Sequence, residues 1–332
     1  MNQTESPTWE ADYCALTSSC GLVLLSNWTQ LVIRGQDRVS FLHNMCTNNI
    51  RDLGAGTGCE AFCTDVKGKI VGHLLVMVEQ EQLTLLTLPE QASKLIAHLE
   101  RYIIREDVQF GETTSDFSWF FVCGPQARGR LAHVLDSPAQ LPTESWRSTT
   151  VFLRDTQCLV VATDLVWPGG FLLRVAACEC DSLSEGISTS RIVDFDSPAF
   201  TAMRVESGFP FYGLDFDSSH LPQEIDRDRR AISFKKGCYL GQETIARIDA
   251  LGHVNKKLAS VKFTGTTIPV VGTSLFQNQI EVGTITSGIW SPGHSAPLGM
   301  GFISRAANSI GSVLESELGS ATIIAPFLTG HS

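Results

Sequence analysis

Apolar residues between positions 70 and 110 follow two different periods, and together they predict a hairpin covered by a helix. Strands are expected at 70–78, 83–88 and 108–110, where short runs are dominated by apolar residues. Pro89 suits the first turn of an intervening helix, whose apolar residues recur at helical spacing at Leu95, Ile96, Leu99, Tyr102 and Ile103. This order predicts an α+β unit with an antiparallel sheet.

The same architecture is expected to continue beyond residue 110, and a different one after Lys257. The apolar run 119–123 predicts a strand, and Gly124-Pro125 ends it before a further helix. After Lys257, short β-rich pieces such as 258–263 alternate with glycines. We expect a small all-β barrel or sandwich there, with the domain boundary at 252–257.

The composition predicts a globular protein. The chain has 332 residues, of which 43% are hydrophobic and 18% charged, so it has enough apolar surface for two or three globular domains. The first twenty residues include acidic residues and lack an apolar segment behind a basic start, which disfavours a secretory signal. No later apolar run approaches the roughly 18 residues of a membrane span. We expect a cytoplasmic protein without a membrane partner.

Net charge and cysteine spacing limit the classes of ligand and partner that we expect this chain to bind. The net charge of −10 argues against strong direct nucleic-acid binding, because phosphate neutralisation needs clustered Lys and Arg. The segment 227–257 departs from this balance, with eight basic and three acidic residues. It is either the place for an anionic ligand or a solvated charged surface. The ten cysteines lie mostly in apolar stretches without C-x2-C spacing, so we expect buried reduced thiols and no bound metal.

Three segments carry the most informative motifs. They are 25–50, 200–213, and the Pro222-Gln223-Glu224 stretch that leads into the run from Lys236 to Glu243, Lys-Gly-Cys-Tyr-Leu-Gly-Gln-Glu. In order and content these segments resemble the YgfZ family, whose members are relatives of the glycine-cleavage T-protein, an aminomethyltransferase. The resemblance covers about residues 22–257 and extends more weakly through the β-rich tail. Its most specific part is the cysteine motif with the Pro-Gln-Glu before it.

The resemblance implies an α+β fold of two intertwined antiparallel-sheet subdomains of ferredoxin-like type and a C-terminal all-β barrel, around a central folate cavity. On this basis we expect residues 1–50 and 145–252 to form the folate-binding subdomain, 51–144 the ferredoxin-like subdomain, and 253–332 the barrel. It also implies that the cofactor is tetrahydrofolate or a one-carbon derivative. The implied partners are iron–sulfur enzymes or assembly proteins, including enzymes that modify tRNA.

Three residues are candidates to hold the pterin ring. One edge of a pterin presents an N–H and an amino group, which a single carboxylate can accept as a paired hydrogen bond, and its face stacks on aromatic rings. By resemblance, Glu206 matches the acid that holds the pterin in the T-protein, and Trp28 and Phe200 match folate-contacting aromatics. Phe200 replaces a tryptophan of the family. The alternative is that Glu206 is an ordinary exposed acid and Phe200 a core residue.

Cys238 is the candidate functional thiol. Lys235 and Lys236 precede it, Gly237 allows close backbone approach, and the segment 241–248 is expected to begin a helix whose N-terminus favours a thiolate. A lowered thiol pKa is therefore our hypothesis, and a small buried hydrophobe is the alternative. The motif also contributes candidate folate contacts or loop-organising residues, namely Lys236, Tyr239, Gln242 and Arg247.

The T-protein carries paired aspartates just after the glycine of the segment that corresponds to 67–74, and Gly72 and His73 stand there in this chain. Without that carboxylate, aminomethyl transfer loses the charge partner of its amine. Our leading hypothesis is a folate-binding accessory protein for iron–sulfur cluster assembly or repair, with Cys238 in a redox or transient ligand role. The alternatives are a folate-dependent aminomethyl or methyl transferase that uses another acid such as Asp65, and a ligand-sensing scaffold that does not need Cys238.

Overall fold

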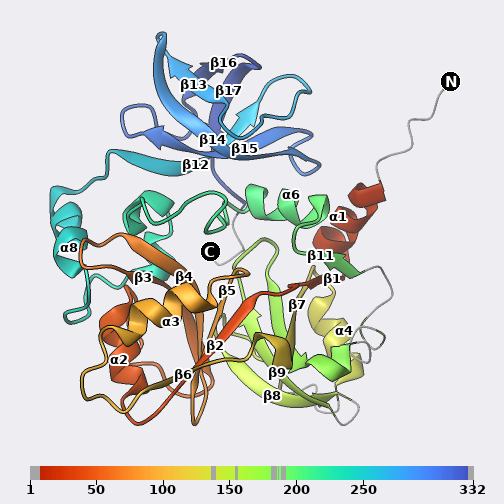
Figure 1. The fold of residues 1–332 in the computed structure, drawn as a ribbon. Coiled ribbons are helices and arrows are strands. Elements are labelled where there is room, and N and C mark those ends of the chain that lie inside the picture. Colours follow the sequence, from red (N-terminus) through yellow and green to blue (C-terminus); the bar gives the residue numbers. More distant parts are fainter. Residues whose placement is uncertain are drawn as a thin grey trace.

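A computed structural model describes residues 8–135, 140–153, 156–180, 185, 187 and 192–327. Two sheets lie side by side, and a closed barrel lies across them (Figure 1). The predicted α+β fold with a C-terminal barrel is confirmed.

The five-stranded sheet is antiparallel and has the order β3-β4-β5-β2-β6. Its strands are β2 (Thr29–Arg34), β3 (Thr57–Thr64), β4 (Ile70–Val78), β5 (Leu83–Thr87) and β6 (Gln109–Glu112). Helices α2 (Arg38–Met45) and α3 (Ala92–Glu100) bury their apolar residues against it, Leu42 and Leu95 among them. The strand predicted at 70–78 is β4, and the helix predicted after Pro89 is α3, which begins at Ala92.

The six-stranded sheet has the order β11-β1-β7-β10-β9-β8. Its strands are β1 (Gly21–Leu24), β7 (Phe117–Cys123), β8 (Ser148–Leu153), β9 (Thr156–Thr163), β10 (Gly170–Ala176) and β11 (Ile192–Asp194). All pairs are antiparallel except β1 with β11. Around it lie α1 (Thr8–Ser18), α4 (Ala127–Val134), α6 (Pro198–Glu206) and the short 3-10 turns η1 (Thr114–Asp116) and η3 (Ala177–Glu179). Helix α6 begins where Ser197 accepts a hydrogen bond from the Phe200 N–H, with Pro198 in its first turn.

The chain crosses between the two sheets, which intertwines them. Strand β1 belongs to the six-stranded sheet and β2 to the five-stranded one, and the chain crosses back between β6 and β7. Strand β2 was assigned to the unit that starts at residue 1, but it pairs with β5 and β6, which lie within residues 51–144. Strand β7 was assigned to the unit 51–144, but it pairs with β1 and β10. The limits of the folding units themselves stay a prediction, because a shared sheet does not by itself define such a unit.

The barrel closes in the order β12-β15-β14-β13-β16-β17. Its strands are β12 (Lys256–Phe263), β13 (Ser274–Gln277), β14 (Ile280–Ser291), β15 (Ala296–Ser304), β16 (Val313–Ser316) and β17 (Gly319–Ile324). Between α6 and the barrel the chain forms η4 (Pro222–Ile225), α7 (Asp228–Ala231) and α8 (Gln242–Leu251). The helix predicted at 241–248 is α8, and α6 packs against β14 and β15 of the barrel.

Candidate functional site

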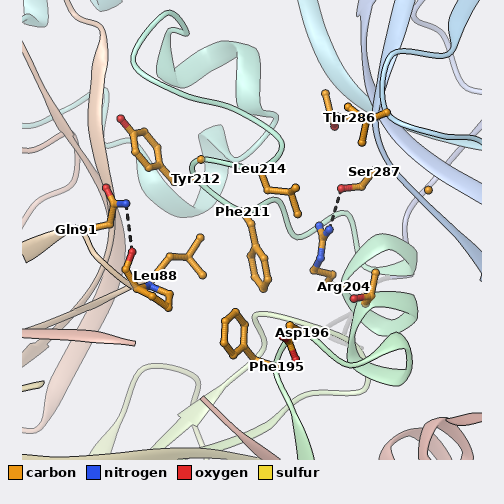
Figure 2. Close-up of a pocket in the computed structure, with 15 residues that line it drawn as sticks. Leu88, Gln91, Phe195, Asp196, Arg204, Phe211, Tyr212, Leu214, Thr286 and Ser287 are labelled. Atoms are coloured by element: carbon orange, nitrogen blue, oxygen red, sulfur yellow. Dashed lines mark hydrogen bonds between the residues drawn. The ribbon is translucent and has the colours of Figure 1, made fainter. Parts of the chain in front are cut away.

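A cavity of about 530 Å³ lies where the two sheets and the barrel meet, and Figure 2 shows its walls. Its lining residues come from five separate segments: Leu88, Pro89 and Gln91 after β5, Phe195 and Asp196 after β11, Thr201 and Arg204 of α6, the loop 211–214, and Val271 with 286–288 of the barrel. A second cavity, of about 670 Å³, shares Pro89, Phe195 and Asp196 with the first. We call the first the central cavity and the second the outer cavity.

Aromatic rings form one wall of the central cavity. Phe195 and Phe211 line it, and their ring centroids lie 6.2 Å apart. Trp28 packs edge-on against both rings, at 6.0 Å from each, and is almost fully buried behind them. Phe200 is also buried and packs against Phe121. Neither of the predicted aromatics lines the cavity: Trp28 packs against the rings of its wall, and Phe200 is a core residue.

Arg204 lines the cavity and belongs to a buried ion pair. Its Nη1 lies 2.8 Å from Oδ2 of Asp215, and its Nη2 donates to the Ser287 hydroxyl at 2.8 Å. The guanidinium also lies 4.6 Å from the ring centre of Phe211. Figure 2 shows the bond from Arg204 to Ser287 across the joint between α6 and the barrel. The Arg204–Asp215 ion pair and the hydrogen bond to Ser287 thus connect Phe211 of the aromatic wall to the barrel.

Glu206, the predicted pterin-binding acid, lies at the end of α6 and does not line the central cavity. Its side chain is 1% exposed. The Tyr13 hydroxyl donates to Oε2 at 2.7 Å, and the Ser291 hydroxyl and the Gly293 N–H donate to Oε1. Burial raises the pKa of this carboxyl group. The protein's own donors thus occupy both oxygens, and Glu206 is not an ordinary exposed acid.

A second buried carboxylate, Glu60 of β3, forms a charge cluster with His73 and Arg227. Both Glu60 oxygens accept hydrogen bonds from the Arg227 guanidinium, and Oε1 lies 2.7 Å from Nε2 of His73. The exposed fractions of Glu60, His73 and Arg227 are 0%, 7% and 6%. This cluster was not predicted from the sequence, although a glutamate inside the apolar run of β3 is a signal that a buried partner exists.

The Glu60 cluster predicts a loss of stability in acid. Burial alone would raise the pKa of Glu60, but Arg227 and His73 together lower it below its ordinary value. Because an unfolded glutamate titrates near pH 4.3, this stabilisation is complete above that pH and declines as the pH falls below it. Urea unfolding from about pH 7 to pH 3 should show the stability difference between wild type and Glu60→Gln shrinking with decreasing pH. A difference that stays constant over this range would contradict the assignment.

Residues 233–241, which we call the Cys238 loop, precede α8 and do not line the central cavity. Cys238 is exposed, as are Cys14 and Cys178, whereas six other cysteines are buried. This excludes the alternative of a buried hydrophobe for Cys238. The predicted residues of α8 lie beside the loop, with Arg247 exposed and Gln242 partly buried.

Lys236 fastens the Cys238 loop to the end of α2. Its Nζ is buried and donates to the carbonyl oxygens of His43, Cys46 and Asn48. It also lies 4.7 Å from the ring centre of Tyr239, which is itself buried. Of the two roles expected for Lys236, the structure shows the organisation of the loop.

The loop also contacts the Asp65-x-Lys-Gly-Lys turn. Leu240 accepts a hydrogen bond from the Thr64 hydroxyl and donates its N–H to the carbonyl of Asn44. Gly241 has a φ of +80°, and a Cβ there would lie 2.4 Å from the Asp65 carbonyl oxygen. Only glycine therefore permits this close approach. Two motifs that are far apart in the sequence meet at this point.

The structure does not bring all eight predicted site residues together. Trp28, Phe200 and Glu206 lie around α6, whereas Cys238 and its neighbours lie beside α8. Figure 1 shows α8 at one edge of the molecule, whereas α6 lies beneath the barrel and beside α1.

The positions considered for the acid of the transferase alternative, Gly72, His73 and Asp65, supply no carboxylate to the lining of the central cavity. A side chain at Gly72 would come within 2.7 Å of Leu95, His73 is held by Glu60, and one Asp65 oxygen accepts the N–H groups of Lys67 and Lys69.

Two further findings concern metals and membranes. In the part of the chain that the structure describes, no group of three His, Cys, Asp or Glu side chains is arranged to hold a metal ion. None of the helices in the described segments is long and apolar enough to cross a membrane.

Comparison with known proteins identifies similar sequences along most of the chain. Residues 2–236 match the family model of the GCVT N-terminal domain, and residues 256–327 match that of the glycine cleavage T-protein C-terminal barrel domain. An aminomethyltransferase of Listeria monocytogenes is 24% identical over 313 residues, which cover 92% of this chain and 84% of that relative. The tRNA-modifying protein YgfZ of Yersinia pestis is 26% identical over 277 residues, covering 81% and 80% respectively.

The fold is similar to that of a solved structure, the glycine cleavage system aminomethyltransferase T of Bartonella henselae. The TM-score is 0.84 with 18% sequence identity, and the superposition covers 97% of this chain and 90% of that one. At this identity the likeness concerns the fold alone.

Proposed function

This chain belongs to the glycine cleavage T-protein family, and from this membership we propose that it is a tetrahydrofolate-binding accessory protein for iron–sulfur cluster assembly or repair. Through that role it supports tRNA modification. Cys238 acts in it as a redox group or as a transient ligand. The chain is YgfZ-like and related to aminomethyltransferase.

The observation that carries this proposal is the exposure of Cys238 on an anchored loop. Free cysteines are usually buried, and six of the ten in this chain are. The Cys238 thiol instead reaches solvent from a loop that Lys236 fastens with three hydrogen bonds. A thiol that is accessible and held in place suits contact with a partner protein or a cluster in transit.

The central cavity supports folate binding. Its volume of about 530 Å³ is within the range of small-molecule sites. Phe195 and Phe211 offer aromatic faces for a planar ring, and the Arg204 guanidinium, which is paired with Asp215, lies beside them. The bound tetrahydrofolate would supply or accept a one-carbon unit, while these residues bind and orient its ring.

The environments of Gly72, His73 and Asp65 favour an accessory role over aminomethyl transfer. By resemblance to the T-protein, the carboxylate that balances the charge of the amine would stand at the positions of Gly72 and His73, and Asp65 is the other acid considered for this task. Leu95 fills the space beside Gly72, Glu60 holds His73, and Asp65 is engaged in its own turn. We therefore expect no turnover by the wild-type protein with an aminomethylated lipoyl carrier.

Complementation tests the proposal. A bacterial strain that lacks its own YgfZ relative should regain iron–sulfur enzyme activity and tRNA thiomethylation with the wild-type chain, and Cys238→Ser should fail to restore either. Cys178→Ser, which alters another exposed cysteine, is the matched control and should complement like wild type. Full rescue by Cys238→Ser would show that the thiol is dispensable, and aminomethyl-transfer turnover by wild type would favour the transferase instead.

A further inference from the structure

Asp196 stands at the junction of the central and outer cavities and lines both. It lies between β11 and α6, next to Phe195 of the aromatic wall, and Figure 2 shows it between Phe195 and Arg204. Its side chain is exposed. Within the described segments, no hydrogen bond or ion pair engages its carboxylate. Both oxygens are thus available to a ligand.

Two neighbouring acids, Asp194 and Asp215, differ from Asp196 in this respect. Asp194 accepts hydrogen bonds from the Ser26 hydroxyl and the Phe195 N–H. Asp215 is buried and paired with Arg204, and it also accepts hydrogen bonds from Thr286 and Ser287. Of these three acids, Asp196 is the one that lines the central cavity and whose carboxylate has no hydrogen bond or ion pair within the described residues.

Glu206 is poorly suited to the role that the family resemblance gives it. Its two oxygens accept hydrogen bonds from Tyr13, Ser291 and Gly293. A Cβ added at Gly293 would lie 2.8 Å from the Tyr13 hydroxyl oxygen, 2.9 Å from the Phe327 ring and 3.0 Å from Glu206 Oε1, so these groups leave little free space beside the carboxylate. Because Glu206 is only 1% exposed, a pterin could reach it only if the groups that surround it moved.

We infer that Asp196, and not Glu206, accepts the paired N–H and amino hydrogen bonds of a bound pterin. A carboxylate with two free oxygens matches this edge bidentately. Phe195 and Phe211 are positioned to contact the ring face, and Gln91 adds a further polar group to the lining. This inference rests on the proposed binding of tetrahydrofolate and specifies which residue recognises its ring.

Titration of the folded protein with 5-formyltetrahydrofolate tests the inference. Hydrogen bonds to charged groups contribute about 1.5–3 kcal/mol, so Asp196→Asn should weaken binding by roughly 10- to 100-fold. Glu206→Gln should bind within about threefold of wild type, provided that its circular dichroism shows a folded protein. Asp249→Asn, which removes an exposed aspartate from α8, is the charge-matched control and should leave affinity unchanged.

A ligand analogue separates recognition from a general effect of charge. A 2-desamino-2-methyl folate lacks the amino donor, so wild type should bind it more weakly than folate. Asp196→Asn should bind this analogue and folate with about the same affinity. Unchanged affinity in Asp196→Asn, or loss of binding only in a folded Glu206→Gln, overturns the inference and leaves folate binding intact. Absence of any folate binding by wild type overturns the proposed function and this inference together.

Discussion

Replacing Glu60 with glutamine is expected to lower the free energy of unfolding by about 3–5 kcal/mol, because breaking a buried ion pair leaves the remaining charge without compensation. The side-chain volume stays nearly the same, but Arg227 loses the carboxylate that accepts both of its hydrogen bonds. His73 loses its charged partner as well. Urea unfolding at neutral pH, monitored by tryptophan fluorescence, measures the change.

An exposed ion pair provides the control for Glu60. Glu144 pairs with Arg147 at 3.2 Å, and their side chains are 74% and 56% exposed. Exposed pairs contribute roughly 0–1 kcal/mol, so Glu144→Gln should leave the urea midpoint almost unchanged. Equal losses in the two variants, or no loss in Glu60→Gln, would mean that the buried cluster does not stabilise the fold.

The larger elements of this fold could be predicted because apolar periodicity determined them locally. Strand β4 was expected at 70–78 and forms there, since its residues are buried almost without interruption. The barrel and α8 were also expected. The assignment of β2 and β7 to sheets could not be deduced from periodicity, because both are apolar strands and only tertiary pairing decides which sheet each one joins.

Much less of the candidate site could be predicted. The segment 200–213 was recognised as informative, and it does supply Thr201, Arg204 and Phe211 to the central cavity. The residue chosen from it, Glu206, is bonded to Tyr13 and Ser291, and these donors could not be foreseen because they come from α1 and β14, which only the tertiary fold brings to α6. Asp196 was overlooked because nothing in its local sequence distinguishes a free carboxylate from the paired ones nearby.

Lys236→Met should release the Cys238 loop from α2 and abolish complementation. Methionine keeps the length of the side chain but removes the ammonium group, so the carbonyls of His43, Cys46 and Asn48 lose their donor. Hydrogen bonds to charged groups contribute about 1.5–3 kcal/mol, and relief from burying the charge offsets part of their loss. We expect a net destabilisation of about 2–3 kcal/mol.

Amide hydrogen exchange distinguishes release of this loop from general destabilisation. The N–H of Ser233 bonds to the Thr47 carbonyl and that of Leu240 to the Asn44 carbonyl, so both should exchange faster in Lys236→Met than in Glu60→Gln, although the latter is destabilised at least as much. Lys235→Met, a change at the exposed neighbouring lysine, should leave exchange and complementation as in wild type. If the two amides stay protected in Lys236→Met while complementation fails, Lys236 acts directly on a ligand or partner and not by positioning Cys238. If complementation persists although the loop is released, the function does not need Cys238 to be held in place.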